Sequence, residues 1–247
     1  MNPPDPIVPG EVRTAQRTLE GEGVEVLRLF PVLRGRMNLD PFVLFDHFFL
    51  EPGTGFPTHP HRGFEAITYL FDGGMRHRDN LGNDSLVTVG GAQRFTAGRG
   101  IEHSEMPDGK TRGIQLWINL PRARKHRKPG YQAVPAGTIP VRRFDGGEAR
   151  VIVGPGSPLQ LQTPVHYEDI RLDAGGETPV EVPAGWQGFV YVVDGAARID
   201  AQALQPGQAM TVVAGAHPLQ TETGVRALAC LGRPHGEPVY QHGPWVD

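Results

Sequence analysis

Two stretches of this sequence match each other, which limits the chain to a fold with two similar halves. AITYLFDGGMRH (66–77) aligns with GFVYVVDGAARI (188–199). Identical positions in this alignment include Tyr69 and Tyr191, Asp72 and Asp194, and Gly73 and Gly195. Self-similarity of this kind is typical of a duplicated unit. We therefore predict two domains, residues 1–135 and 136–247, with the junction near PGYQAVPAGTIP (129–140), which is rich in linker residues.

The repeated unit is predicted to be a β-barrel. Short runs such as Ile67-Thr68-Tyr69 alternate with period two, while long helical periodicity is scarce. The 33 glycines and 24 prolines are spread through the chain, so they indicate many tight turns between short strands. An all-β protein of closed sandwiches or barrels is the expected result.

Composition excludes several classes of partner. The formal net charge is -3, and no apolar run approaches the roughly 18 residues of a membrane span, so we expect neither membrane nor direct nucleic-acid binding. The basic run from Arg122 to Lys128 lacks interleaved aromatic residues and is predicted to be a solvated loop. Cys230 is the only cysteine and the N-terminus lacks a signal-peptide pattern, so a soluble cytoplasmic protein is expected.

Two pairs of chemically active side chains stand out in the first half. His59 and His61 are two residues apart in THPHRGFE, and His103 and Glu105 are two apart in GRGIEHSEMP. Side chains two apart on a strand share a face, so each pair should point to one side of its strand. The same parity, continued along the chain, predicts that this face also carries the residues Glu65, Ile67, Tyr69 and Phe71.

Such pairs on neighbouring strands would place three imidazole nitrogens and one carboxylate around a point inside the barrel. Buried groups of this kind without partners cost several kcal/mol, so we predict a bound cation. Nitrogen and oxygen ligands without thiolate suit Fe(II), Ni(II), Cu(II), Mn(II) or Zn(II) in a site with open positions. Parity alone leaves Glu65 and Glu105 as alternatives for the fourth ligand.

The motifs HPHRGFE and TAGRGIEHSEMP, with the closing GEPVYQHGPWVD, resemble the pirin family. This resemblance implies two tandem cupin barrels of jelly-roll type. It also implies one metal ion, most often iron as Fe(II), held in the N-terminal barrel by His59, His61, His103 and Glu105. Glu65 would then orient an imidazole or the RGF turn, and the tail after about residue 235 would pack on the N-terminal barrel.

The second half is predicted to lack a metal site. In the alignment, Glu181 and Pro183 replace the first histidine pair, and Leu219 and Thr221 replace the second pair. His217 is the only imidazole nearby. A structural or partner-binding role is expected for this domain.

The resemblance implies an oxidoreductase of the quercetin 2,3-dioxygenase type, which opens flavonols with dioxygen and releases carbon monoxide. The ion would lower the pKa of the flavonol 3-hydroxyl, and Glu105 would accept its proton. The expected partner is a small flavonol-like aromatic substrate, held by an apolar lining of Ile67, Tyr69, Phe71 and Ile101.

A regulatory protein is the alternative, because other pirins resemble regulators. An iron-dependent redox sensor would use the same four ligands to bias a surface that binds a transcription factor or metabolic enzyme. His77 is expected to flank a turn; the alternative is a position near the mouth of the barrel interior, because residue 77 shares the parity of the preceding strand. His47 is expected to be a packing residue.

Overall fold

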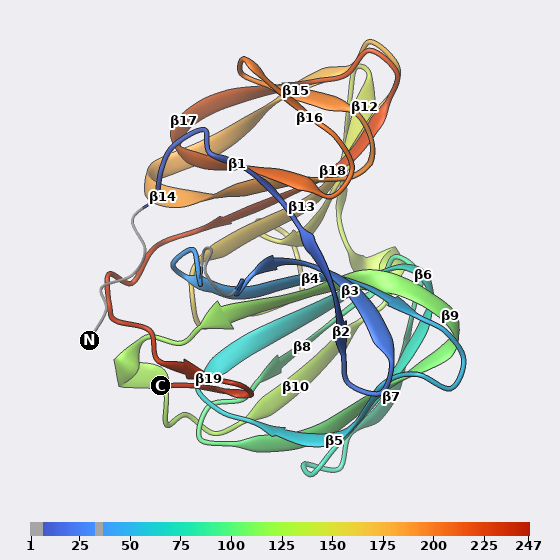
Figure 1. Cartoon of the computed structure of the whole chain (residues 1–247), viewed down its shortest axis with the longest axis vertical. Helices are drawn as coiled ribbons and strands as arrows, with labels where there is room; N and C mark the ends of the chain where they lie inside the picture. Colours follow the sequence, from blue (N-terminus) through green and yellow to red (C-terminus); the bar gives the residue numbers. More distant parts are fainter. Residues whose placement is uncertain (1–6, 33–36) are drawn as a thin grey trace.

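A computed structural model describes residues 7–32 and 37–247, and these form two β-domains stacked one above the other (Figure 1). Within these ranges the helical segments are two short 3-10 turns, η1 (Arg122–Arg124) and η2 (Ala136–Thr138). None of the helices described is long and apolar enough to cross a membrane. The prediction of an all-β protein with two barrel-like domains is confirmed.

The first domain is built on one antiparallel sheet, in the order β10-β8-β6-β9-β4-β3-β2, with β5 pairing to β9 and β7 to β6. Its strands are β2 (Gln16–Glu20), β3 (Val24–Phe30), β4 (Phe42–Leu50), β5 (Phe56–His61), β6 (Phe64–Asp79), β7 (Asp84–Thr88), β8 (Ala92–Thr96), β9 (Ile101–Asn119) and β10 (Gly130–Val134). The long strands β6 and β9 pair along almost their whole length and give the domain its curved shape.

The second domain repeats this plan in the order β11-β12-β13-β18-β14-β17-β15-β16. Its strands are β11 (Val141–Phe144), β12 (Gly147–Val153), β13 (Val165–Leu172), β14 (Glu177–Gly195), β15 (Ala197–Ile199), β16 (Gln202–Leu204), β17 (Gln208–Gln220) and β18 (Val225–Gly232). A boundary at residue 135 stays a prediction.

Gly73 and Gly195, which align in the sequence, serve the same purpose in the two domains. Both have a positive φ, 72° and 80°. The strand register shifts between Asp72 and Gly74 around the first, and between Val192 and Asp194 just before the second. A Cβ atom would lie 2.1 Å from a carbonyl oxygen at Gly73 and 2.3 Å from one at Gly195. Only glycine fits such a bend, so the duplication seen in the sequence extends to the backbone.

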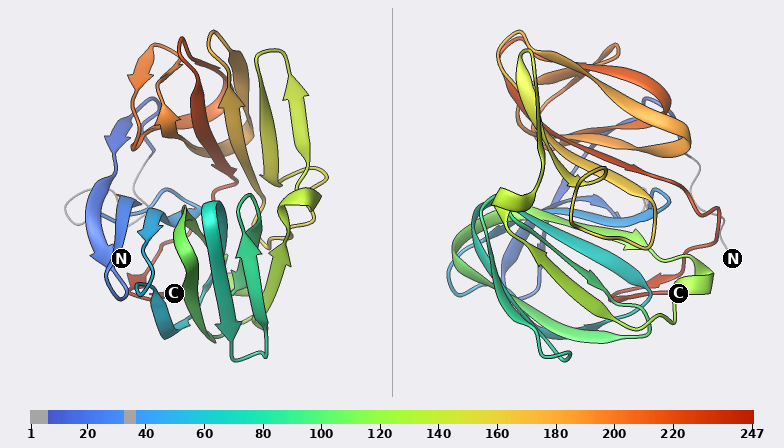
Figure 2. Two further views of the ribbon diagram at one scale, coloured as in Figure 1. Left: turned by 90° about the vertical axis from the view of Figure 1, so that its right-hand side faces the viewer. Right: turned by 180° about the vertical axis from the view of Figure 1, so that it is seen from behind.

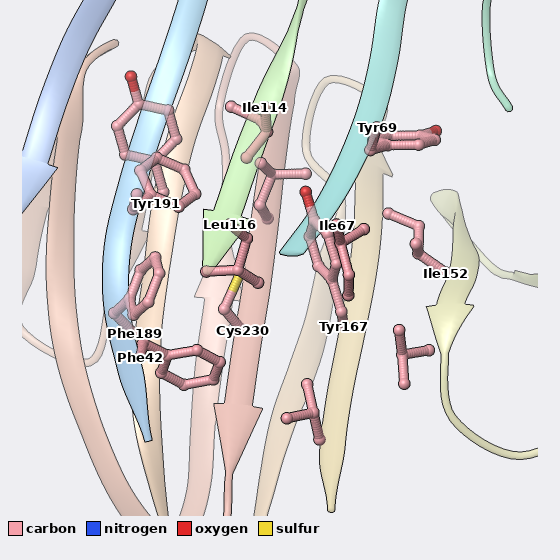
Figure 3. Close-up of a cluster of buried hydrophobic side chains, with 14 of the residues drawn as sticks. Phe42, Ile67, Tyr69, Ile114, Leu116, Ile152, Tyr167, Phe189, Tyr191 and Cys230 are labelled. Atoms are coloured by element: carbon pink, nitrogen blue, oxygen red, sulfur yellow. The ribbon is translucent and has the colours of Figure 1, made fainter. Parts of the chain in front are cut away.

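The two domains meet through a shared apolar core (Figure 3). Phe42, Ile67, Tyr69, Ile114 and Leu116 approach from the first domain, and Ile152, Tyr167, Phe189, Tyr191 and Cys230 from the second. Phe189 packs edge-on against three phenylalanine rings of the first domain. Interfaces of this apolar character hold domains in one arrangement.

The expected lining of the metal-site interior was therefore wrong for three residues. Ile67, Tyr69 and Phe71 belong to the interdomain core. The alternation of faces does not continue from β5 into β6, because the chain breaks strand geometry at Arg62 and Gly63. Gly63 has a φ of 87°, and a Cβ atom there would lie 1.7 Å from the Val246 carbonyl oxygen. The parity of side chains is reset at this turn.

The interior of the second domain is apolar where the first domain carries histidines. Val180, Val182 and Leu219 are buried in one apolar cluster with residues of β17 and β18. Glu181 and Pro183, which align with the first histidine pair, are exposed. No group of potential metal ligands is found in this domain among the residues described. The loss of a metal site from this domain stays a prediction.

Both ends of the described chain lie on the opposite domain. Strand β1 (Val12–Thr14) pairs with β17 of the second domain. After β18 the chain returns to the first domain, where the hairpin of β19 (Gln241–His242) and β20 (Trp245–Val246) lies near β5 (Figures 1 and 2). Arg62 forms a parallel bridge with Trp245 and an ion pair with Asp247 at 2.7 Å.

Candidate metal centre

Strand register brings the two predicted pairs together. The first part of β9 lies between β5 and the second half of β6. His103 is opposite His59 on one side and Asp79 on the other, while Glu105 is opposite Phe56 and His77. Side chains directly opposite on antiparallel strands are close neighbours.

His59, His61 and His103 form a tight cluster. One nitrogen from each ring lies within 4.8 Å of the others, and the ring centroids are 4.5 to 5.0 Å apart. Nδ1 of His59 lies 2.7 Å from the Pro57 carbonyl oxygen, and Nδ1 of His61 lies 3.2 Å from that of Pro244. Because a carbonyl only accepts hydrogen bonds, both rings carry their proton on Nδ1 and keep the lone pair on Nε2.

His103 gives the clearest indication that the cluster binds an ion. Its Nε2 atom is buried and has no hydrogen-bond partner among the residues that the structure describes, whereas Nδ1 lies 3.4 Å from Nδ1 of His77. Burial lowers the pKa of His103 well below its ordinary value, and burial with neighbouring His59 lowers that of His61 to about 3. Both rings are therefore neutral and able to ligate an ion. The donor set fits a divalent metal.

Glu105 is held by three donors. Thr68 Oγ1 and Gln93 Nε2 donate to Oε1 at 2.8 and 2.5 Å, and Gln115 Nε2 donates to Oε2 at 3.0 Å. A carboxylate has about four acceptor positions, so one lone pair of Oε2 is left for another partner. Glu105 also belongs to a second close group with His77 and His103.

Glu65 lies elsewhere, and its predicted role was wrong. Its Oε1 atom accepts a hydrogen bond from Thr96 at 2.6 Å, and Oε2 accepts one from the backbone N–H of Gln162 at 2.7 Å. It orients neither an imidazole nor the RGF turn in these contacts. Burial raises its pKa, and the bond to Gln162 ties the first domain to the segment before β13.

His77 does not flank a turn, and the structure favours the alternative that places it near the barrel interior. Strand β6 continues through Gly73 and Gly74 to Asp79, so His77 is a fully buried strand residue next to His103. The signal was available: Met75, His77 and Asp79 continue an alternation after the glycine pair. His47 packs in the domain interface, stacked on Phe49 with ring centroids 4.6 Å apart.

A cleft of about 660 Å³ opens beside the cluster. His59, His61 and Glu105 contribute to its wall. Its apolar surface comes from β3, β4, β5, β6 and β9 through Val26, Leu44, Phe48, Phe56, Met75 and Trp117. Acidic groups join them, namely Glu20, Glu22 and Asp46, and the tail adds Gln241, Gly243 and Pro244. Ile101, expected in the lining, is instead packed in a neighbouring apolar cluster.

The basic run from Arg122 to Lys128 is only partly exposed to solvent. Lys125 is turned inward, where Nζ donates to the carbonyl oxygens of Gly63 and Val246 and to Oδ1 of Asn119. Burial lowers its pKa to about 8. Arg124 donates to the carbonyl oxygen of Gln162. Arg122, Arg127 and Lys128 are further exposed cations of the run.

Comparison with protein families identifies both domains. The family described as Pirin matches residues 23–118, and the Pirin C-terminal cupin domain matches residues 167–247. These two matches account for most of both sheets. The cupin type of the jelly-roll domains is thereby shown.

Individual relatives align along nearly the whole chain. A Pseudomonas aeruginosa protein named "Putative quercetin 2,3-dioxygenase" is 36% identical over 264 residues, covering 96% of this chain and 90% of the relative. Pirin of Homo sapiens is 39% identical over 243 residues, covering 92% and 83%. The crystal structure of quercetin 2,3-dioxygenase from Acinetobacter baumannii superimposes with a TM-score of 0.88 at 30% identity, covering 96% and 90%.

Proposed function

Since the chain belongs to the pirin family, we propose that it is a metal-dependent dioxygenase that opens flavonols such as quercetin. The observation that carries this proposal is the buried Nε2 of His103, which has no hydrogen-bond partner among the residues described and lies beside two other imidazoles and Glu105 in the wall of an open cleft. The relatives named for quercetin 2,3-dioxygenase support the substrate class.

We propose that His59, His61, His103 and Glu105 hold one divalent ion, with Fe(II) the preferred metal. A divalent ion here would supply Lewis acidity, which lowers the pKa of a substrate hydroxyl. The chain's contribution is to present three nitrogens in fixed tautomers. Two backbone carbonyls, of Pro57 and Pro244, fix the first two rings.

The cleft suits a flat, neutral molecule with hydroxyl groups. Leu44, Phe48 and Trp117 offer apolar walls that would pack against a ring and exclude water. Arg28, the one lysine or arginine among the lining residues described, is paired with Asp46 at 2.6 Å and with Glu20 at 2.6 Å. The surplus of carboxylates would repel an anion and accept hydrogen bonds from phenols.

Glu105 is proposed as the base that takes the 3-hydroxyl proton. The three donors to Glu105 keep the carboxylate in place and leave one lone pair on Oε2. That lone pair would accept the proton when the carboxylate is detached from the ion. Such fixed donors hold a base within reach of the proton that it abstracts.

The test is quercetin consumption together with carbon monoxide release, using protein loaded anaerobically with Fe(II). We expect turnover in the wild type and none in His61→Ala, while His242→Ala, at an exposed histidine, keeps the wild-type rate. Equal turnover in His61→Ala would contradict the proposed centre. Stable iron binding without any turnover would contradict the dioxygenase and favour the regulatory alternative.

A further inference from the structure

We propose that Asp79 and His77 form a hydrogen-bonded relay that sets the tautomer and orientation of His103. Both act as positioning residues for the metal centre. The inference rests on the proposed function only in requiring that His103 ligates an ion.

The three side chains form a continuous line across two strands. His77 Nδ1 lies 3.4 Å from His103 Nδ1, and His77 Nε2 lies 3.0 Å from Asp79 Oδ2. The side chains of His77 and Asp79 are both fully buried. Asp79 is also directly opposite His103 in the pairing of β6 with β9, so all three side chains lie on these two strands.

Only one arrangement of protons satisfies every atom in this line when His103 binds an ion. Nε2 of His103 has no partner within the described parts of the chain and must offer its lone pair to the ion, so the proton is on Nδ1. That proton is donated to Nδ1 of His77, whose own proton is then on Nε2 and is donated to Asp79. Partners of this kind fix a ligand's tautomer and raise its basicity.

Asp79 is held rigidly as the end of the relay. Its Oδ1 atom accepts hydrogen bonds from the backbone N–H groups of Leu81 and Asn83, at 2.9 and 3.0 Å. The Asn83 amide donates to both carboxylate oxygens. Although burial alone would raise the pKa of Asp79, these bonds and the one from His77 lower it, so the carboxylate is ionised.

Tyr131 keeps His77 in its plane. The two rings are stacked with centroids 4.0 Å apart and an interplanar angle of 13°. Tyr131 also donates to Oε1 of Gln93 at 2.8 Å, and Gln93 donates to Glu105. One aromatic ring therefore links the supports of both ligands on β9.

The experiment measures Co(II) binding, with the visible ligand-field bands as a second readout. His77→Phe keeps a ring against Tyr131 but removes both hydrogen bonds, and we expect Co(II) affinity to fall about 10- to 100-fold with a shift in the bands. Asp79→Asn should lower affinity about 10-fold. His77→Gln can accept from His103 and donate to Asp79, so it should restore most of the loss.

Asp84→Asn is the matched control, because Asp84 pairs with Arg76 and Arg78 on the same hairpin but is exposed. It should leave affinity and bands unchanged, and thermal melts of the metal-free proteins check folding. Wild-type affinity and bands in both His77→Phe and Asp79→Asn would overturn the relay. A loss in His77→Phe with none in Asp79→Asn would overturn it too, and make His77 a ligand.

These readouts separate the relay from the proposed activity. Altered Co(II) binding in the variants supports the relay even if quercetin is not turned over. Failure of the wild type to bind Co(II) would overturn both the relay and the metal centre.

Discussion

At the scale of single residues, the chain surrounds Glu105 with hydrogen-bond donors before any ion binds. Three donors on three different strands reach it, from Thr68, Gln93 and Gln115. Hydrogen bonds to a charged group are stronger than neutral ones, and the donors would be left unsatisfied by a neutral residue. The position therefore tolerates neither a change of charge nor a change of acceptor pattern.

Glu105→Gln tests this. The new amide places a donor against existing donors and removes the charge, so we expect metal affinity to fall at least about tenfold and quercetin turnover to stop. Affinity is measured by chelator competition and turnover by absorbance. Glu102→Gln, at an exposed position of the same strand, is the control. Normal turnover in Glu105→Gln would remove this residue from the role of base.

The four proposed ligands could be found from the sequence because they stand in two short motifs. Gln93 and Gln115 could not, since only the register of β8 and β9 brings these amides to Glu105. The role of Pro244 is harder to predict, because it supports His61 through its backbone carbonyl. Any residue type could supply that carbonyl, so the sequence does not reveal the contact. Supports that act through the backbone or across distant strands escape motif reasoning.

At the scale of elements, the turn at Gly63 determines which side chains of β5 and β6 face the histidine cluster and which face the interdomain core. It ends β5, reverses the faces of β6, and makes room for β20 to lie beside Arg62. Period-two reasoning holds within a strand and fails across such a turn, which is why the apolar run of β6 was assigned to the wrong side. Lys125 then fastens the turn and the tail together.

Lys125→Met should loosen the tail. The variant leaves three buried acceptors without their donor, at a cost of at least about 1.4 kcal/mol, or about tenfold in local opening. Amide hydrogen exchange of Val246, whose N–H donates to Arg62, should quicken by that factor. Lys128→Met, at an exposed neighbour, should not change it. Unchanged exchange in Lys125→Met would show that the hairpin is held by other contacts.

At the scale of the whole molecule, the two domains share one core, and a buried histidine lies at its edge. His47 accepts a hydrogen bond from Arg112 Nε at 2.9 Å, and its Nδ1 lies 3.1 Å from the Tyr191 hydroxyl. Burial, helped by Arg112, lowers the pKa of His47 to about 3. The domains are therefore joined through a neutral imidazole.

This makes the interface sensitive to acid. In the unfolded chain His47 has a pKa of about 6.5, so below that pH the unfolded state binds a proton that the folded state does not, and stability falls. Between pH 7.5 and 5 the loss from this group is about 2 kcal/mol. Urea unfolding at both pH values should show a smaller loss in His47→Gln. Equal losses in the two proteins would contradict this assignment.

The bond between His61 and Pro244 joins residues 183 positions apart. A ribosome makes the chain from its N-terminus, so the whole histidine cluster is synthesised well before the carbonyl that orients one of its rings. The nascent first domain therefore lacks one support of the proposed metal centre. Metal loading of that centre would then follow synthesis of the second domain, and would draw on the metals present where the finished chain folds.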